Sequence, residues 1–288
     1  MDPLFELLRP ARLTVVVDIG ANPIDTAPPY RSMLQQRLCR VVGFEPQDNA
    51  LATLNRQKSD LETYLPYVVG DGAAATLRQC QHSGMTGLFE PDPNILSHFP
   101  VFTTLGRVLG EIPVVTRRLD DIAEITDLDF LKIDVQGSEL AVFQNGRNRL
   151  SKAVAIQTEV SFLPLYKGQP VFGDVDLELR AQGFVPHTFV SQFKLLIAPM
   201  QFKDPYFGLN QVVEADIVYV RDFTRAESME PEQLKHLAMV AHHCYGSFDL
   251  ALNCIMQLVK RGIMERSVGE RYLQSVNARA SAARPGMP

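Results

Sequence analysis

The chain has 288 residues, of which 46% are hydrophobic and 21% charged, values typical of a globular protein with a sizeable core. Its formal net charge is -5 and no basic stretch is interleaved with aromatic residues, so we do not expect a nucleic acid as its main partner. No run approaches the roughly 18 apolar residues of a membrane span, and the four dispersed cysteines, without a CxxC pair, predict reduced thiols in a cytoplasmic protein.

Short apolar strands alternate with helical stretches from residue 14 to about residue 222. In chain order, strands are predicted over 14–18, 40–45, 63–70, 129–135, 153–160, 184–190 and 215–222. Helices are predicted over 30–39, 49–59, 137–146 and 172–183. The strands are near-continuous valine-rich runs, which favours an α/β fold in which helices cover both faces of a mostly parallel sheet. The last two strands are expected to pair like a hairpin.

Two aromatic, proline-bearing segments interrupt this pattern, 71–113 and 191–214. Long irregular segments are uncommon without a role, so the first is interpreted as a lid or substrate loop. The aromatic side chains of the two segments could stack on a sugar or a flat acceptor, or simply anchor the loops. They are Phe89, Phe99, Phe102, Phe202, Tyr206 and Phe207.

The character of the chain changes after residue 225. Residues 231–262 have the pattern of two helices, and residues 265–280 that of a third. We therefore predict a main α/β domain over 1–225 and a small helical appendage over 226–288. The apolar faces of the first two helices are expected to cover either this domain or a second subunit in a homo-oligomer.

Acidic side chains stand at the carboxyl ends of the first three predicted strands. The residues concerned are Asp18 with the turn Gly20, Ala21 and Asn22, then Glu45, then Asp71 with Gly72. Ligands of parallel sheets bind beyond the carboxyl ends of the strands, and glycine lets the backbone approach them closely. Glu45 is placed to accept hydrogen bonds from both hydroxyls of a ribose, and Asp71 from the amino group of an adenine. The pattern predicts a bound nucleoside.

The first turn decides which nucleoside is expected. A dinucleotide would need GxGxxG and a P-loop GK[ST], whereas the sequence has GANPID. Ile24 stands where a third glycine would be, and Asp25 would repel a phosphate. S-adenosylmethionine has no phosphate, and its ribose, adenine, ammonium and positively charged sulfonium all suit an acid-lined turn. It is therefore the expected cofactor.

The stretches VDIGAN, GFEP and LKIDVQGSEL, followed by a strand ending in TEV, resemble the FkbM-type methyltransferases in order and spacing over residues 14 to 190. The resemblance implies a Rossmann-like class I methyltransferase fold with a seven-strand sheet, S-adenosylmethionine as cofactor, and O-methylation, often of sugar or polyketide hydroxyls. Pro46 of GFEP joins the expected cofactor-binding residues. Two departures are Gln136, where the family usually has glutamate, and Pro23-Ile24, which replace the usual second glycine of the turn. The first removes a charge beside Asp134 and so bears on the acceptor chemistry.

Methyl transfer to a hydroxyl is an in-line displacement, in which a general base typically contributes about 10²–10⁴-fold. Asp134 and Glu159 end the fourth and fifth expected strands, at the same sheet edge as Asp18. We expect Asp134 to face both cofactor and acceptor, and Glu159 to act as the base or an acceptor ligand. His187 is an alternative base, although a histidine in a strand is more often packed.

Two groups of residues have side chains that could bind a metal ion. A Mg²⁺ site formed by Asp134 with Glu159 is an open alternative, but the predicted site contains no metal. The cluster His242-His243-Cys244 is expected to pack instead of binding zinc, because adjacent helical side chains point about 100° apart and no cysteine pair supports them.

The leading prediction is an S-adenosylmethionine-dependent O-methyltransferase whose acceptor is a saccharide, another glycan or a similar small molecule. An N-methyltransferase stays open, because nothing in the sequence separates oxygen from nitrogen acceptors. Gln136 and Ile24 also keep open a catalytically degenerate binding module, in which the appendage recruits a partner. The missing GxGxxG argues against a nicotinamide-dependent oxidoreductase.

Overall fold

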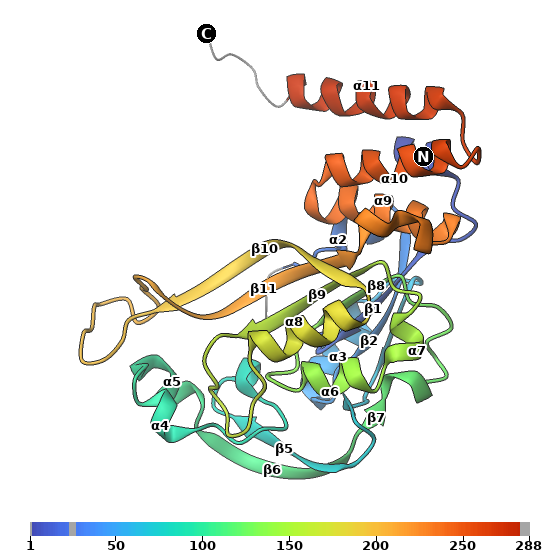
Figure 1. Ribbon diagram of the computed structural model, residues 1–288. Helices are drawn as coiled ribbons and strands as arrows, with labels where there is room; N and C mark the ends of the chain where they lie inside the picture. The colour runs from blue at the N-terminus through green and yellow to red at the C-terminus, as the bar shows by residue number, and fades with distance from the viewer. Residues whose placement is uncertain (1, 23–26, 283–288) are drawn as a thin grey trace.

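The computed structural model describes residues 2–22 and 27–282 (Figure 1), so Pro23, Ile24 and Asp25 lie outside the described residues. One sheet of seven strands forms the centre, in the order β10-β11-β9-β8-β1-β2-β3. The bounds are β1 (Thr14–Ile19), β2 (Cys39–Phe44), β3 (Glu62–Leu65), β8 (Phe130–Ile133), β9 (Ala155–Ser161), β10 (Phe184–Leu195) and β11 (Gln211–Arg221). β11 is antiparallel to both β9 and β10, and the other neighbours pair in parallel. The predicted mostly parallel seven-strand sheet is confirmed.

Helices cover both faces of the sheet, because successive side chains of a strand point to opposite sides. Val16 packs in one core with side chains of α1, α2, α9 and α10, whereas Val17 packs with α6, α7 and α8 on the other face. The bounds are α1 (Pro3–Leu8), α2 (Arg31–Gln35), α3 (Asp48–Gln57), α6 (Glu139–Gln144), α7 (Arg147–Leu150), α8 (Phe172–Ala181), α9 (Pro231–Tyr245), α10 (Phe248–Lys260) and α11 (Arg266–Ala282). None of the described helices combines the length and apolarity needed to cross a membrane.

The third predicted strand, 63–70, is divided into two. Its first part is β3, at the edge of the main sheet, and its second part is β4 (Val69–Gly70), which pairs with β7 (Arg117–Arg118). Pro66 stands between them and has no N–H to donate to a ladder. The chain therefore leaves the main sheet earlier than its apolar pattern indicates.

The C-terminal helices stack on the sheet in the order α9, α10, α11 (Figure 1). The central part of α9, residues 236–242, is buried on every side, and its apolar residues share one core with strands β1, β2, β8 and β11. A helix of this kind needs cover on both sides, which the sheet and α10 provide. The division of the chain at residue 226 stays a prediction, since this core runs across it.

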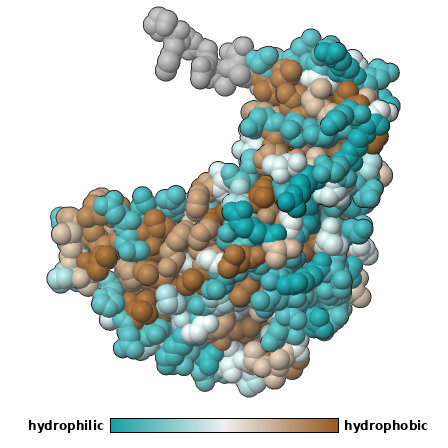
Figure 2. Space-filling model, viewed as in Figure 1, coloured by the Kyte–Doolittle hydropathy of each residue, from teal (hydrophilic) through white to brown (hydrophobic). Residues whose placement is uncertain are grey.

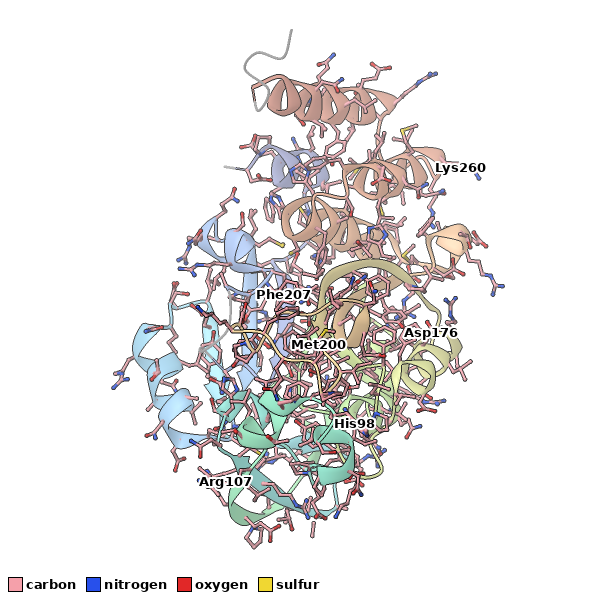
Figure 3. All side chains as sticks on the ribbon, turned by 90° about the vertical axis from the view of Figure 1, so that its left-hand side faces the viewer. His98, Arg107, Asp176, Met200, Phe207 and Lys260 are labelled. Atoms are coloured by element: carbon pink, nitrogen blue, oxygen red, sulfur yellow. The ribbon has the colours of Figure 1, made fainter. Side chains whose placement is uncertain are left out.

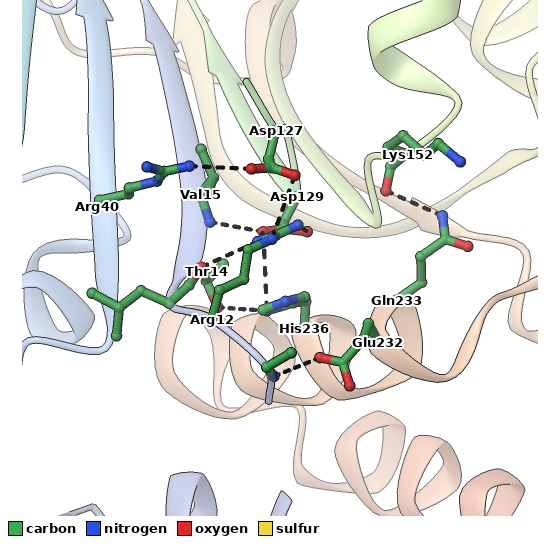
Figure 4. A network of polar contacts seen from close by, with 12 residues as sticks. Arg12, Thr14, Val15, Arg40, Asp127, Asp129, Lys152, Glu232, Gln233 and His236 are labelled. Carbon is green, nitrogen blue, oxygen red and sulfur yellow. Dashed lines mark hydrogen bonds and ion pairs between the residues drawn. The ribbon is translucent and has the colours of Figure 1, made fainter. Parts of the chain in front are cut away.

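A polar network ties α9 to the amino-terminal ends of β1 and β8 (Figure 4). Asp129 accepts hydrogen bonds from the Arg12 guanidinium and, at 2.7 Å, from Val15 N–H. His236 of α9 contacts Thr14 Oγ1 through Nδ1 at 3.0 Å. Because these contacts lie at the end of the strands opposite to Asp134, the network is structural.

The segment 71–113, interpreted above as a lid, contains regular structure. An antiparallel pair, β5 (Ala74–Cys80) and β6 (Val108–Val115), encloses the short helices α4 (Pro93–Leu96) and α5 (Pro100–Leu105). Phe99 and Phe102 are buried in a small core that they share with Leu195 of β10 and Val213 of β11, so these two aromatics anchor the segment.

The strands β10 and β11 extend beyond the predicted ranges and project from the body as a ribbon (Figure 1). Apolar side chains gather on the projecting end (Figure 2), and Met200 and Phe207 lie on the face turned to the viewer in Figure 3. Phe202, Tyr206 and Phe207 are about half exposed, at 55%, 51% and 46%. The aromatics of this second segment are therefore available for contacts, unlike those of the first.

Candidate functional site

The turn after β1 is held tightly against the end of β8. Gly20 has φ +78°, and a Cβ at this position would lie 1.9 Å from the carbonyl oxygen of Asp134. Asp134 N–H donates to Ile19 O at 3.0 Å, which continues the pairing of the two strands beyond their ends. Only glycine can occupy position 20, because any side chain would clash with the backbone of Asp134. The close contact places the turn after β1 next to Asp134.

Asp18 lies beneath this turn and contacts the side chains that support it. Its carboxylate accepts a hydrogen bond from Tyr30 Oη at 2.6 Å and lies 3.5 Å from Lys132 Nζ. Lys132 also donates to the carbonyl oxygen of Gly20 at 3.3 Å. Asp18 is 3% exposed and does not line the pocket described next. The structure thus places it beneath the turn, where it orders the backbone.

A pocket of about 660 Å³, part of it open to solvent, lies at the carboxyl edge of β1, β2 and β8. Three further segments complete its wall, residues 67–69, 83–88 and 134–138. Of the predicted cofactor-binding residues, the pocket is lined by Gly20, Asn22, Glu45, Pro46 and Asp134. Ala21 is not among the lining residues.

Glu45 follows β2 and is 2% exposed. Burial raises the pKa of its carboxyl group, against the hydrogen bond that it accepts from Gln47 N–H at 2.8 Å. A carboxylate offers about four lone-pair sites, so further donors can bind to it. Glu45 therefore keeps the capacity for a pair of hydroxyl groups that the sequence predicted.

Asp71 and Gly72 lie elsewhere. The Asp71 carboxylate accepts hydrogen bonds from Ala73 N–H at 2.9 Å and from Thr116 Oγ1 at 3.1 Å, which lower its pKa. Neither residue lines the pocket, because the chain leaves the main sheet at Pro66, before it reaches Asp71. Tyr67 stands on the pocket wall in their place.

The ends of β8 and β9 bring Asp134 and Glu159 together around one amide. Gln136 Nε2 donates to Asp134 Oδ1 and to Glu159 Oε2, both at 2.9 Å. Gln136 Oε1 accepts a hydrogen bond from Tyr166 Oη at 2.8 Å. Burial, and next the charge of Asp134, raise the pKa of Glu159. We call Asp134 and Glu159 the acid pair.

Further carboxylates surround the acid pair. Glu139 is buried and accepts a hydrogen bond from Val135 N–H at 2.8 Å, and its pKa is raised by burial to about 7. Asp216 of β11 pairs in register with Glu159, and burial raises the pKa of both Asp216 and Glu214. Oxygens of Asp134, Glu139 and Glu159 lie within 4.8 Å of one another. Since the Gln136 amide already bridges two of these groups, we assign no metal there.

The histidines contact other parts of the fold. His187 Nε2 lies 2.7 Å from Ser247 Oγ, at the start of α10, and burial lowers the His187 pKa. It does not line the pocket. His242 Nδ1 contacts Tyr272 Oη at 2.9 Å, and no histidine joins a metal-binding group within residues 2–22 and 27–282. The expectation that the histidine cluster packs agrees with these contacts.

Sequence reasoning missed Ser138 and Tyr166. Ser138 is 4% exposed, lines the pocket, and its Oγ finds no hydrogen-bond partner in the described part of the chain. Buried hydroxyl groups in native structures are nearly always hydrogen-bonded, so Ser138 is a candidate to bind a ligand in the pocket. Ser138 is part of the motif LKIDVQGSEL, so it could have been predicted from the sequence. No local sequence pattern predicts the contact of Tyr166 with Gln136.

With this geometry in view, the comparison with known families is decisive. Residues 18–186 match the methyltransferase FkbM domain. The chain belongs to this family. Its methyl donor is S-adenosylmethionine, as predicted, and its fold is that of the class I methyltransferases.

Among similar curated proteins is the 2-O-methyltransferase NoeI of Sinorhizobium fredii (strain NBRC 101917 / NGR234), 32% identical over 192 residues, which cover 58% of this chain and 74% of that protein. Similar solved structures include magnesium protoporphyrin IX methyltransferase from Synechocystis PCC 6803 with bound S-adenosylmethionine (11% identity, TM-score 0.36, 76% of each chain). Another is precorrin-6y C5,15-methyltransferase from Geobacter metallireducens GS-15 (14% identity, TM-score 0.34, 75% of this chain and 84% of that one). No argument rests on likenesses this remote.

Proposed function

We propose that the protein transfers a methyl group from S-adenosylmethionine to a hydroxyl group of a saccharide or a similar small molecule. The observation that carries this proposal is the acid pair, held by the Gln136 amide: Asp134 and Gln136 line a pocket that also contains Glu45, while Glu159 lies behind them. The relative named for 2-O-methylation supports oxygen as the atom that is methylated.

Several features of the pocket fit the donor. Glu45 suits the two ribose hydroxyls, and Gly20 lines the same pocket. Ser138 offers a hydroxyl without a partner among the described residues. Acidic groups at this edge favour a ligand with a net positive charge. Once bound, S-adenosylmethionine supplies the activated methyl group together with its leaving group.

In this proposal Glu159 accepts the proton of the acceptor hydroxyl, and Asp134 orients that hydroxyl. A carboxylate whose pKa is raised is a stronger base once it is ionised. Burial raises the pKa of Glu159, so Glu159 titrates nearer to the working pH than an exposed glutamate does. His187, bonded to Ser247, is not needed for this role.

The test is methyl transfer from donor carrying a tritiated methyl group to fractionated glycans and small metabolites. We expect label in a hydroxyl-bearing fraction, and loss of at least about 10²-fold in rate for Glu159→Gln, the contribution of a general base. Label that enters only protein or lipid fractions, or an unchanged rate in Glu159→Gln, would contradict the proposal.

An amine acceptor is a second candidate, since the carboxylates of Glu214 and Asp216 beside the acid pair would also bind a cation. The ¹³C NMR shift of the transferred methyl group separates an O-methyl ether from an N-methyl amine. A degenerate binding module would bind the donor without any transfer.

A further inference from the structure

The backbone of Gln136 is held in an unfavourable conformation. Its φ is +55°, in the left-handed region, and Gly137 follows with φ +99°. This region costs a residue with a Cβ about 1–2 kcal/mol. Such strain persists where surrounding contacts determine the conformation, and it is common at functional sites. Here the contacts are the three hydrogen bonds of the Gln136 side chain.

Tyr166 decides which way the Gln136 amide points. Its hydroxyl carries one hydrogen, and it lies 2.8 Å from Gln136 Oε1 and 3.4 Å from Met85 O. With the shorter bond made, the amide oxygen faces Tyr166 and both amide hydrogens face the acid pair. Tyr166 is 1% exposed, and burial raises its pKa, so it keeps this hydrogen at neutral pH.

We propose that Tyr166 and Gln136 are positioning residues for the acid pair: the Tyr166 hydroxyl fixes the orientation of the amide, and the amide holds Asp134 and Glu159 in place for the acceptor. The role in catalysis rests on the proposed function, whereas the effect on the acid pair does not. The Gln136 amide thus supplies two donors where a glutamate at this position would supply none.

The network has a consequence for the titration of Glu159. N–H donation favours the ionised carboxylate and lowers its pKa, whereas burial and nearby negative charges raise it. The groups that face Glu159 are Asp134 from β8, Glu139 from α6, Glu214 and Asp216 from β11, and the amide of Gln136. If the Gln136 amide loses its orientation, the hydrogen bond that lowers the Glu159 pKa is lost, while burial and the neighbouring carboxylates still raise it. The titration midpoint of Glu159 must then move to higher pH.

The experiment titrates the full-length protein labelled with ¹³C at the glutamate carboxyl carbon, followed by NMR, with Glu159→Gln to assign the signal. In Tyr166→Phe we expect the Glu159 midpoint to rise by about 1 pH unit, since a hydrogen bond to a charged group contributes about 1.5–3 kcal/mol. Gln136→Glu, which conserves volume, should raise it further because it adds a negative charge. An unchanged Glu159 midpoint in Tyr166→Phe would overturn the proposal.

Tyr245→Phe is the matched control. The Tyr245 hydroxyl also donates to a glutamine side chain, Gln157 Oε1, at 2.9 Å, but Gln157 has no such bond to the acid pair. This variant should leave the Glu159 midpoint unchanged, and an equal shift would mean that Tyr166 acts only through general stability. In turnover assays Tyr166→Phe should lower kcat with little change in KM for the donor. If the wild type transfers no methyl group at all, the proposed function fails while the NMR titration still decides the role of Tyr166.

Discussion

Ser138 offers a test in which one substitution affects the free protein and its complex differently. Its Oγ is buried in the pocket wall without a hydrogen-bond partner in the described residues. A buried unsatisfied hydroxyl costs about 1–3 kcal/mol. Ser138→Ala should therefore leave the free energy of unfolding unchanged or raise it by up to about 1 kcal/mol. The same change should weaken S-adenosylhomocysteine binding about 3- to 10-fold, the value of one hydrogen bond at about 0.5–1.5 kcal/mol.

Ser161→Ala is the control for this prediction. Ser161 is equally buried, at 4% exposure, but its Oγ accepts a hydrogen bond from Gln169 Nε2 at 2.7 Å, and it does not line the pocket. Loss of the Ser161 hydroxyl leaves the Gln169 amide without this acceptor. It should lower the free energy of unfolding by about 1–3 kcal/mol without altering the affinity for S-adenosylhomocysteine. Urea denaturation and calorimetric titration measure the two quantities. If Ser138→Ala destabilises the free protein as much as Ser161→Ala does and still binds S-adenosylhomocysteine with normal affinity, the assignment of the Ser138 hydroxyl as a ligand-binding group is wrong.

Three other outcomes are expected. Glu45→Ala should weaken S-adenosylhomocysteine binding by about 10²- to 10⁴-fold in calorimetry, because two hydrogen bonds to a charged group, at about 1.5–3 kcal/mol each, are lost; an unaltered affinity would remove the ribose assignment. The wild-type kcat should rise with pH through the raised pKa of Glu159, since only the ionised carboxylate accepts a proton, and a profile without such a rise above the ordinary pKa range of glutamate would count against this base. Asp129→Asn should lower the free energy of unfolding by about 2–4 kcal/mol, because it weakens the bonds to Arg12 and Val15, yet leave ligand affinity intact, and a matching loss of affinity would show that the network of Figure 4 reaches the pocket.

The arrangement of the strand ends could be predicted from the sequence because parallel strands share one carboxyl edge. This rule placed Gly20, Glu45 and Asp134 on one pocket and brought Glu159 to Asp134. It depends only on knowing where each strand stops. Where a stop was misjudged, as at Pro66, the residue inferred from it, Asp71, fell outside the pocket.

What the sequence could not show are contacts between distant segments. Gln136 counted as a lost charge, and its role as a bridge depends on Tyr166, 30 positions away, and on a positive φ. The burial of α9 depends on which helices cover the sheet, and the apolar pattern of 231–262 is equally compatible with a second subunit. Local patterns contain no information on either choice.

A crystal structure with S-adenosylhomocysteine is the most direct test of the account. We expect the Glu45 carboxylate at about 3 Å from both ribose hydroxyls, the Ser138 hydroxyl bonded to the ligand, and the sulfur atom on the side of the acid pair. Ligand bound outside the pocket, or Glu45 distant from the ribose with the sulfur turned away from Asp134 and Glu159, would contradict it.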